Sequence, residues 1–184
     1  MYAGAVSSGN GITDIGDKSV TITDTTVSDA STLNTLNGYT SGVITADGVT
    51  ALTGTASVLN TLLTAGNDTN QFSTNSFASL ATATVSDSTM SIAHLNGAIA
   101  QANTATGKST LAAGATVFSV SSGATINSGA EAAFETLLDN ETNGNISITD
   151  QNLTVDSGSI SVANAKLLAA TTTGTVTASI DTTE

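Results

Sequence analysis

Hydrophobic residues in this chain recur in short runs, first with a period of two and then with helical spacing. Val20 and Ile22 alternate with threonines, which predicts a strand with one covered face. Leu33 and Leu36 follow at helical spacing behind the cap candidate Asp29, which predicts a short helix. The same succession of strand, helix and strand returns several times before the chain ends.

The later elements follow from the same two periods. Further strands are predicted at residues 43–44, 49–52, 117–120, 145–150, 153–155 and 172–178. Further helices are predicted at residues 58–63, 92–99, 132–138 and 163–170. Ser128 is the predicted cap of the third of these helices, and Gly38 is the predicted stop of the first helix in the chain. The leucines predicted to anchor successive helices in the core are Leu33, Leu59, Leu95, Leu137 and Leu167.

Two internal matches indicate a repeat protein. Residues 145–150 (NISITD) resemble residues 19–24 (SVTITD), and residues 172–178 (TTGTVTA) resemble residues 40–46 (TSGVITA). We therefore predict a flexible or assembly-pairing lead-in at residues 1–18 and one repeat-built domain at residues 19–184. Its modules are expected at about residues 19–66, 78–115, 116–144 and 145–184.

A strand that returns through a helix to the next strand runs parallel to it. The predicted fold is therefore an α/β repeat, mainly β with short helices, in which helices cover one face of a parallel or mixed sheet. A β-solenoid or a β-sandwich is the alternative, because Thr, Val and Ile form strands throughout. The chain contains no proline, a common guard of sheet edges, so its strand edges are compatible with assembly.

The charge balance excludes some partners. Fifteen acids face three lysines, giving a net charge of −12, which argues against nucleic acid and anionic membranes. No cysteine is present, which excludes disulfides and thiolate metal sites. The first residues, MYAGAVSSGN, lack the features of a signal peptide, and no apolar run is long enough for membrane insertion. Export would therefore need another signal.

The segment ITDTTVSDASTLNTLNGYTSGVITADGVTALTGTASVLNTLL resembles the repeats of very large Thr/Ser/Asp-rich surface and secreted proteins of marine cyanobacteria and other marine bacteria, the β-strand-repeat proteins. ISITDQ and SVANAKLLAATTTGTVTASID resemble a second variant of these repeats. The resemblance covers most of the chain apart from residues 1–18 and the loops around Gln71 and Thr104. It implies a non-enzymatic surface, adhesion or motility-associated protein that binds calcium and is exported without a cleaved N-terminal signal.

Carboxylates are the candidate metal ligands, because calcium prefers several oxygen ligands. They also serve as helix caps and turn formers, and we place this structural role ahead of calcium binding. No EF-hand loop is present. The calcium candidates are Asp14, Asp17, Asp24, Asp29, Asp150 and Asp156.

No set of residues in the sequence predicts catalysis or cofactor binding. Gly107-Lys108-Ser109-Thr110 resembles the end of a phosphate-binding loop but lacks the earlier glycine, so it is read as a polar turn. His94 is the single histidine and is expected half-buried on a helix, without a triad partner. Pairs of the form Thr-x-Thr, such as Thr82 and Thr84, could order water or bind ice if they line a flat sheet.

The sequence therefore predicts a non-enzymatic structural protein of the cell surface or extracellular space, which self-assembles into a filament or layer or serves in adhesion. Its expected partners are further copies of itself, with glycans or a cell surface as other possibilities. A phage structural protein, located in the virion as a tail fibre or capsid decoration, is one alternative. An ice- or glycan-binding module is the other.

Overall fold

The computed structural model describes residues 15–104 and 116–181. The elements in chain order are β1 (Val20–Thr21), β2 (Thr26–Val27), α2 (Ser31–Tyr39), β3 (Ile44–Thr45), β4 (Ala51–Gly54), α3 (Ala56–Gly66), β5 (Thr82–Val85), β6 (Thr89–Ser91), α4 (Ile92–Thr104), β7 (Val117–Val120), β8 (Thr125–Ala130), α5 (Glu131–Thr142), β9 (Ile146–Ser147), β10 (Asn152–Ile160), α6 (Val162–Thr171) and β11 (Val176–Ile180). Strands and helices thus recur along the whole described chain, as predicted.

All strand pairings between the described strands are parallel. β1 pairs with β3, a second sheet has the order β2-β4-β5-β7-β9, and a third has the order β6-β8-β10-β11. Parallel neighbours need a crossover connection, and helices provide it here. Each strand therefore pairs with a strand one turn of the chain earlier, one turn later, or both.

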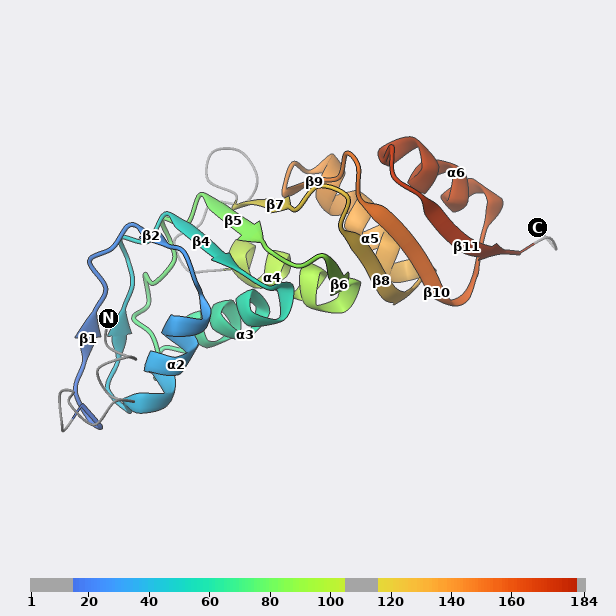
Figure 1. Cartoon of the computed structure of the whole chain (residues 1–184). Helices are drawn as coiled ribbons and strands as arrows, with labels where there is room; N and C mark the ends of the chain where they lie inside the picture. Colours follow the sequence, from blue (N-terminus) through green and yellow to red (C-terminus); the bar gives the residue numbers. More distant parts are fainter. Residues whose placement is uncertain (1–14, 105–115, 182–184) are drawn as a thin grey trace.

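The chain therefore forms a stack of coils. A coil consists of one or two strands and the helix that follows, and β11 is the start of the last coil. Figure 1 shows the coils advancing in order from β1 at one end to β11 at the other, with α2, α3 and α4 side by side along the strands. Each helix contacts the helix of the next coil, from α2 through to α6. This confirms the predicted α/β fold with parallel strands covered by helices, whereas the β-sandwich alternative is not what forms.

One continuous hydrophobic cluster runs through the stack. Aromatic residues are rare, and all four phenylalanines are buried in it. Phe72 and Phe77 fill the long connection between α3 and β5, with ring centroids 5.4 Å apart. Phe72 also forms a parallel bridge with Ile44, which extends the β1-β3 sheet by one residue of the next coil.

Asparagines join neighbouring helices beside the core. In each of the first three described helices a buried leucine comes directly before an asparagine, and these leucines are Leu33, Leu59 and Leu95. The Asn34 side chain of α2 donates to the main-chain oxygen of Val58 in α3 over 3.1 Å. The Asn96 side chain of α4 donates to the oxygen of Ala133 in α5 over 2.8 Å. In α2 and α4 the Leu-Asn pair thus gives the coil an apolar anchor and a polar link to the next helix.

Three local predictions are wrong. Leu167 is 54% exposed, and its neighbour Leu168 is the buried leucine of α6. Ser128 does not cap α5: it lies in β8 with φ of 62°, at an irregularity in the pairing with β10. α5 instead begins at Glu131 without a side-chain cap. Gly38 does not stop α2, which continues to Tyr39.

Candidate functional site

The calcium candidates near the N-terminal end of the stack do not converge. Asp17 lies beside Lys18, with 2.6 Å between carboxylate oxygen and Nζ, and both side chains are exposed. Asp24 is exposed and has no side-chain hydrogen bond within residues 15–104 and 116–181. Asp29 accepts from the main-chain N–H of Ser31 over 2.9 Å at the start of α2. Hydrogen bonds from the Ser31 side chain and main chain lower the pKa of Asp29.

The candidates of the fifth coil bond to the chain itself. Asp150 bonds through Oδ2 to the Ser122 hydroxyl, and its Oδ1 accepts from the Gln151 side chain over 2.8 Å. Asp156 accepts from the main-chain N–H of Ser128 over 3.0 Å, which supports the irregular point of β8. These two carboxylates therefore join the fourth and fifth coils.

Within the described ranges no group of three or more His, Asp or Glu side chains is close enough to hold a metal ion. Asp14 lies outside the described residues. The remaining five candidates are exposed or act as turn formers and links between coils, and the structure brings no set of them together as a ligand cage.

Two further carboxylates, Asp87 and Glu131, bind across coils, which the sequence did not predict. Asp87, in the turn between β5 and β6, accepts from the main-chain N–H of Ala56 over 2.7 Å and so caps α3 of the preceding coil. Glu131, the first residue of α5, accepts from the main-chain N–H of Ser161 over 2.9 Å at the start of α6. A helix N-terminus favours negative charge, so both contacts stabilise the stacking of neighbouring coils.

The environment of Glu131 stabilises its ionised form. Hydrogen bonds from the main-chain N–H of Ser161 and then from the Asn164 side chain lower the pKa of Glu131, against small opposing effects of desolvation and Asp181. The distance from the Asn164 amide to the Glu131 carboxylate is 2.7 Å. α5 and α6 are therefore joined by a charged hydrogen-bond network.

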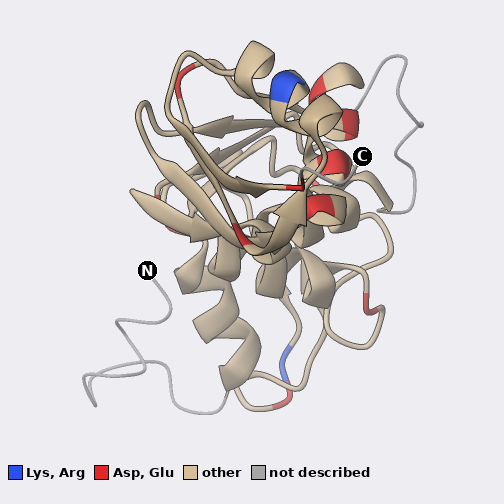
Figure 2. Ribbon diagram, turned by 90° about the vertical axis from the view of Figure 1, so that its right-hand side faces the viewer, with Lys and Arg blue, Asp and Glu red and all other residues tan. Residues whose placement is uncertain are grey.

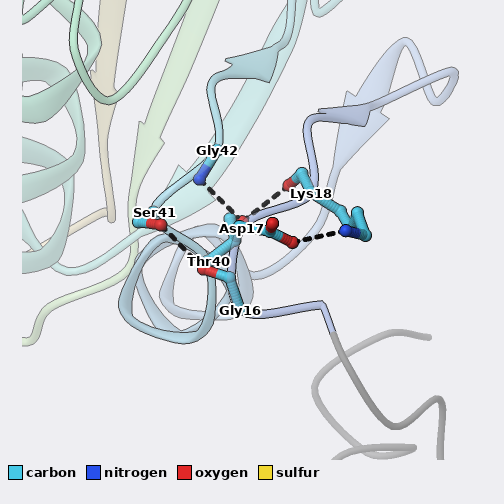
Figure 3. Close-up of polar contacts among 6 residues, drawn as sticks. All are labelled: Gly16, Asp17, Lys18, Thr40, Ser41 and Gly42. Carbon is cyan, nitrogen blue, oxygen red and sulfur yellow. Dashed lines mark hydrogen bonds and ion pairs between the residues drawn. The ribbon is translucent and has the colours of Figure 1, made fainter.

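A Thr-x-Gly turn attaches each of two strands to the preceding coil, and Figure 3 shows the first of them. The Thr40 hydroxyl donates to the oxygen of Lys18 over 2.6 Å and accepts from the N–H of Gly42 over 2.9 Å. Ser41 donates its main-chain N–H to the oxygen of Gly16 over 2.8 Å. A Cβ on Gly42 would lie 2.3 Å from the carbonyl carbon of Lys18, so only glycine allows this approach.

The second Thr-x-Gly turn repeats these contacts after α6. Thr172 donates to the oxygen of Gln151 over 2.7 Å and accepts from the N–H of Gly174 over 2.9 Å. Thr173 donates its main-chain N–H to the oxygen of Thr149 over 2.8 Å. Residues 40–46 and 172–178 are therefore structurally equivalent, as their sequence match indicated.

The acceptor segments correct the other internal match. The two Thr-x-Gly turns contact residues 15–22 (IGDKSVTI) and 148–155 (ITDQNLTV), which share Ile, Asp, an apolar residue, Thr and a second apolar residue at matching places. The structural equivalent of residues 15–22 is thus 148–155, and the likeness of 145–150 to 19–24 is out of register. β9 lies in the five-stranded sheet, whereas β1 pairs with β3.

The N-terminal end of the stack is hollow. β1, β2, α2 and their connecting turns surround a space of about 460 Å³. Its residues all come from the first coil, on the side where the described part of the chain places no further coil. Its lining combines hydroxyls and carboxylates with the apolar residues Ile22, Val27, Leu33 and Leu36.

The C-terminal end of the stack exposes apolar residues, and nothing in residues 15–104 and 116–181 packs over it. β11 pairs on one side only, with β10. Val162 and Leu167 of α6 and Ile180 of β11 are 42%, 54% and 43% exposed. The sequence VTASI of β11 carries no charge.

A rank of hydroxyls lies on the outer face of the five-stranded sheet. Thr53 is in register with Thr84, Thr84 with Ser119, and Ser119 with Ser147. Thr84, Ser119 and Ser147 are exposed. The predicted Thr82 and Thr84 pair therefore does lie on a solvent-facing sheet.

Charged residues and candidate catalytic residues are few in this chain. Acids occur on several sides of the molecule (Figure 2), and four of them lie in α5. His94 is exposed on α4, more so than expected. The Gly107–Thr110 turn lies outside the described residues.

No described helix has the length and hydropathy to cross a bilayer.

Comparison with protein families, with characterised proteins and with solved structures finds no match for this chain.

Proposed function

We propose that this chain is a non-enzymatic structural protein that self-assembles through the free strand edges at the two ends of its stack. The observation that supports this most is the parallel stack itself, whose first strands, β1 and β2, and last strand, β11, each have a described neighbour on one side only. An unpaired edge leaves main-chain N–H and C=O groups free, and such edges are templates for pairing with another chain.

Two common protections against edge pairing are missing from these strands. Proline and charged side chains on the edge strand are such devices. The chain has no proline, and neither β1, β2 nor β11 contains a charged residue. β11, with five residues, offers the longer edge, whereas β1 and β2 are short strands of two residues each.

The setting that we propose is the cell surface or extracellular space, as a filament or layer subunit or as an adhesive module. The hydroxyl-rich surface and the net charge of −12 suit a protein that stays hydrated outside the cell while its uncharged edge strands associate. The likeness to β-strand-repeat proteins points to the same setting.

Sedimentation velocity over a range of protein concentrations tests the proposal. We expect species larger than the monomer that grow with concentration, with and without calcium. A single monomeric species of 18.0 kDa at every concentration and in both conditions would contradict self-assembly.

A second candidate function rests on the hydroxyl rank of Thr53, Thr84, Ser119 and Ser147. Strands in a sheet are about 4.8 Å apart, so these hydroxyls form a regular array that suits ordered water or a glycan. Thermal hysteresis and glycan-array binding measure the two ligands. Activity that Thr84→Lys abolishes, and that Thr64→Lys on the exposed side of α3 leaves unchanged, would support this function.

A further inference from the structure

We propose that two copies stack head to tail, with β1, β2 and α2 of a second copy forming the next coil on β11 and α6 of the first. This inference rests on the proposed self-assembly and specifies its surface and register. Val20 and Thr21 of the second copy would pair with Val176 and Thr177 of the first. Thr26 and Val27 would follow beside Ser179 and Ile180.

The strands at the two free edges already pair with strands of the same type inside the chain. Val20-Thr21 pairs with Ile44-Thr45, and Leu153-Thr154 pairs with Val176-Thr177, in each case apolar residue with apolar residue and threonine with threonine. The free side of β11 and the free side of β1 therefore present the same apolar-Thr pair that these internal contacts use. A second copy is therefore a partner whose edge matches these internal pairings.

The flanking Thr-x-Gly turns extend this equivalence beyond two residues. Each turn precedes a strand with the apolar-Thr pair and bonds to the segment before the partner strand. β1 and the first half of β10 occupy equivalent positions in their coils. The first coil is thus built like the coil on which β11 rests, and can follow β11 as β11 follows β10.

α3 shows which sides of α6 a further coil would cover and which it would leave open. α3 and α6 align through their caps, because the Thr55 and Ser161 hydroxyls each accept from the N–H three residues later, over 3.2 Å. At three aligned positions α3 exposes Ser57, Thr61 and Thr64, and α6 exposes Ala163, Leu167 and Ala170. Because α3 lies between α2 and α4, a further coil would leave this side of α6 open.

Other positions of α3 are buried where the next helix packs against it. Ala56 and Leu63 of α3 are 1% and 2% exposed, where α4 follows as the next helix. The aligned residues of α6 are Val162 and Ala169, and both are exposed. A further helix beside α6 would cover them, and α2 of a second copy is the helix that stacking of the first coil would bring there.

The opposite end offers the complementary shape and charge. The hollow of about 460 Å³ in the first coil has apolar walls from Leu33 and Leu36 and an acidic rim with Asp24 and Asp29. The end formed by α6 and β11 presents apolar side chains and one cation, the exposed Lys166. Unlike surfaces therefore face each other in a head-to-tail contact.

A contact between unlike surfaces repeats without closing unless its rotation forms a ring. A symmetric contact of two β11 edges would instead place the strands antiparallel, unlike the pairings of the described residues. The parallel register thus favours an open filament with one polarity.

Cysteine cross-linking tests the register, because the chain contains no cysteine of its own. Thr21 and Thr177 are exposed on their strands and would be neighbours across the contact. Neighbouring strands lie about 4.8 Å apart, within the Cα separation that a disulfide spans. We expect an equimolar mixture of Thr21→Cys and Thr177→Cys, oxidised after assembly, to give a mixed disulfide dimer as the main cross-linked species.

The controls separate this register from other contacts. Each variant alone, and Thr177→Cys mixed with Thr84→Cys, should stay largely monomeric on denaturing gels. Dimers of Thr177→Cys with itself would show a symmetric contact and overturn the proposal. Absence of the mixed dimer would also overturn it.

A second pair of variants tests the helix contact independently. Ala169→Glu, at the position aligned with the buried Leu63, should raise the concentration needed for assembly at least about tenfold, because stacking would bury an unpaired carboxylate. Thr61→Glu, at an exposed position of α3, should leave that concentration unchanged. Assembly that persists in Ala169→Glu and gives no mixed disulfide would refute this interface but keep the proposed function, whereas no assembly of the unmodified chain would refute the proposed function.

Discussion

The hydroxyl of Thr172 and the main-chain oxygen of Gln151 are 2.7 Å apart, and this contact fixes the start of β11 on the coil before it. Thr40 makes the same contact with Lys18 over 2.6 Å near the other end of the chain. In both cases the threonine also orders the following glycine by accepting its N–H. One local turn thus does two tasks, ending a helix and setting the register of the next parallel strand.

The approach of Gly174 to the preceding coil predicts a large effect of a single methyl group. A Cβ at this position would lie 2.3 Å from the main-chain oxygen of Gln151, so the strand would have to move. We expect Gly174→Ala to lower the free energy of unfolding by about 1–3 kcal/mol, as for overpacking at a rigid contact. Urea unfolding followed by circular dichroism measures this.

Gly48→Ala is the matched control, because nothing lies within 4 Å of the added Cβ there. Since repeat proteins can open one coil at a time, hydrogen exchange at Leu153, which pairs with Val176, shows whether the loss is local. Equal stability of Gly174→Ala and Gly48→Ala would contradict the close approach.

The carboxylate of Asp87 predicts coupling between the second and third coils. Asp87→Ala removes the acceptor for the N–H of Ala56 at the start of α3. Loss of a helix cap costs about 1 kcal/mol, and we expect a loss of that size in urea unfolding. Asp24→Ala removes an exposed carboxylate with no side-chain bond in the described part of the chain and should change stability little. Equal effects of the two substitutions would argue against the inter-coil cap.

The lowered pKa of Glu131 predicts a pH-dependent contribution to stability. A carboxylate whose pKa is lower in the folded state stabilises the fold above its unfolded pKa of about 4.3, and this gain disappears as pH falls through the folded value. Glu131→Gln should therefore be less stable than the unmodified chain near pH 7, with a difference that shrinks below about pH 4.3.

Thermal unfolding at pH values from about 3 to 7, a range that includes the titration of carboxylates, measures this difference. Glu141→Gln is the control on the same helix, because the Glu141 side chain accepts no hydrogen bond among the described residues. A difference between Glu131→Gln and the unmodified chain that stays constant with pH would refute the role of the charge.

The separated carboxylates predict little effect of calcium on the fold. Among residues 15–104 and 116–181 no acidic group gathers into a metal site. We therefore expect calcium and a chelator to leave the Tm of the monomer unchanged. A rise of Tm with calcium that Asp150→Asn or Asp156→Asn abolishes would show that these two residues, which bond to neighbouring coils here, rearrange into a site.

The period of hydrophobic residues predicted most elements because each coil buries one face of a strand and one stripe of a helix. Leu33, Leu59 and Leu95 lie in the core as this period requires. The pattern failed at α6, because apolar residues are spread around that helix and their spacing cannot distinguish Leu167 from Leu168. Which leucine is buried depends on the neighbouring coil.

The contacts between coils could not be predicted, since they join residues far apart in the sequence. Asp87 looks like a cap for the helix that follows it, yet it caps the helix of the coil before. Ser128 precedes α5 as a cap would, but its positive φ and the bond to Asp156 place it at an irregular strand pairing. Short Thr/Ser/Asp patterns recur so often here that sequence alone cannot show which copy contacts which.

Electron microscopy of the purified chain tests most directly whether the stack continues from one molecule to the next. Each coil contributes one strand layer, and with β11 as the last the described residues form six layers. At about 4.8 Å per layer, a head-to-tail filament should repeat about every 29 Å along its axis. Unbranched filaments with that subunit repeat and strands stacked along the axis are the predicted result. Isolated particles at every concentration, or pairs related by a two-fold axis, would contradict it.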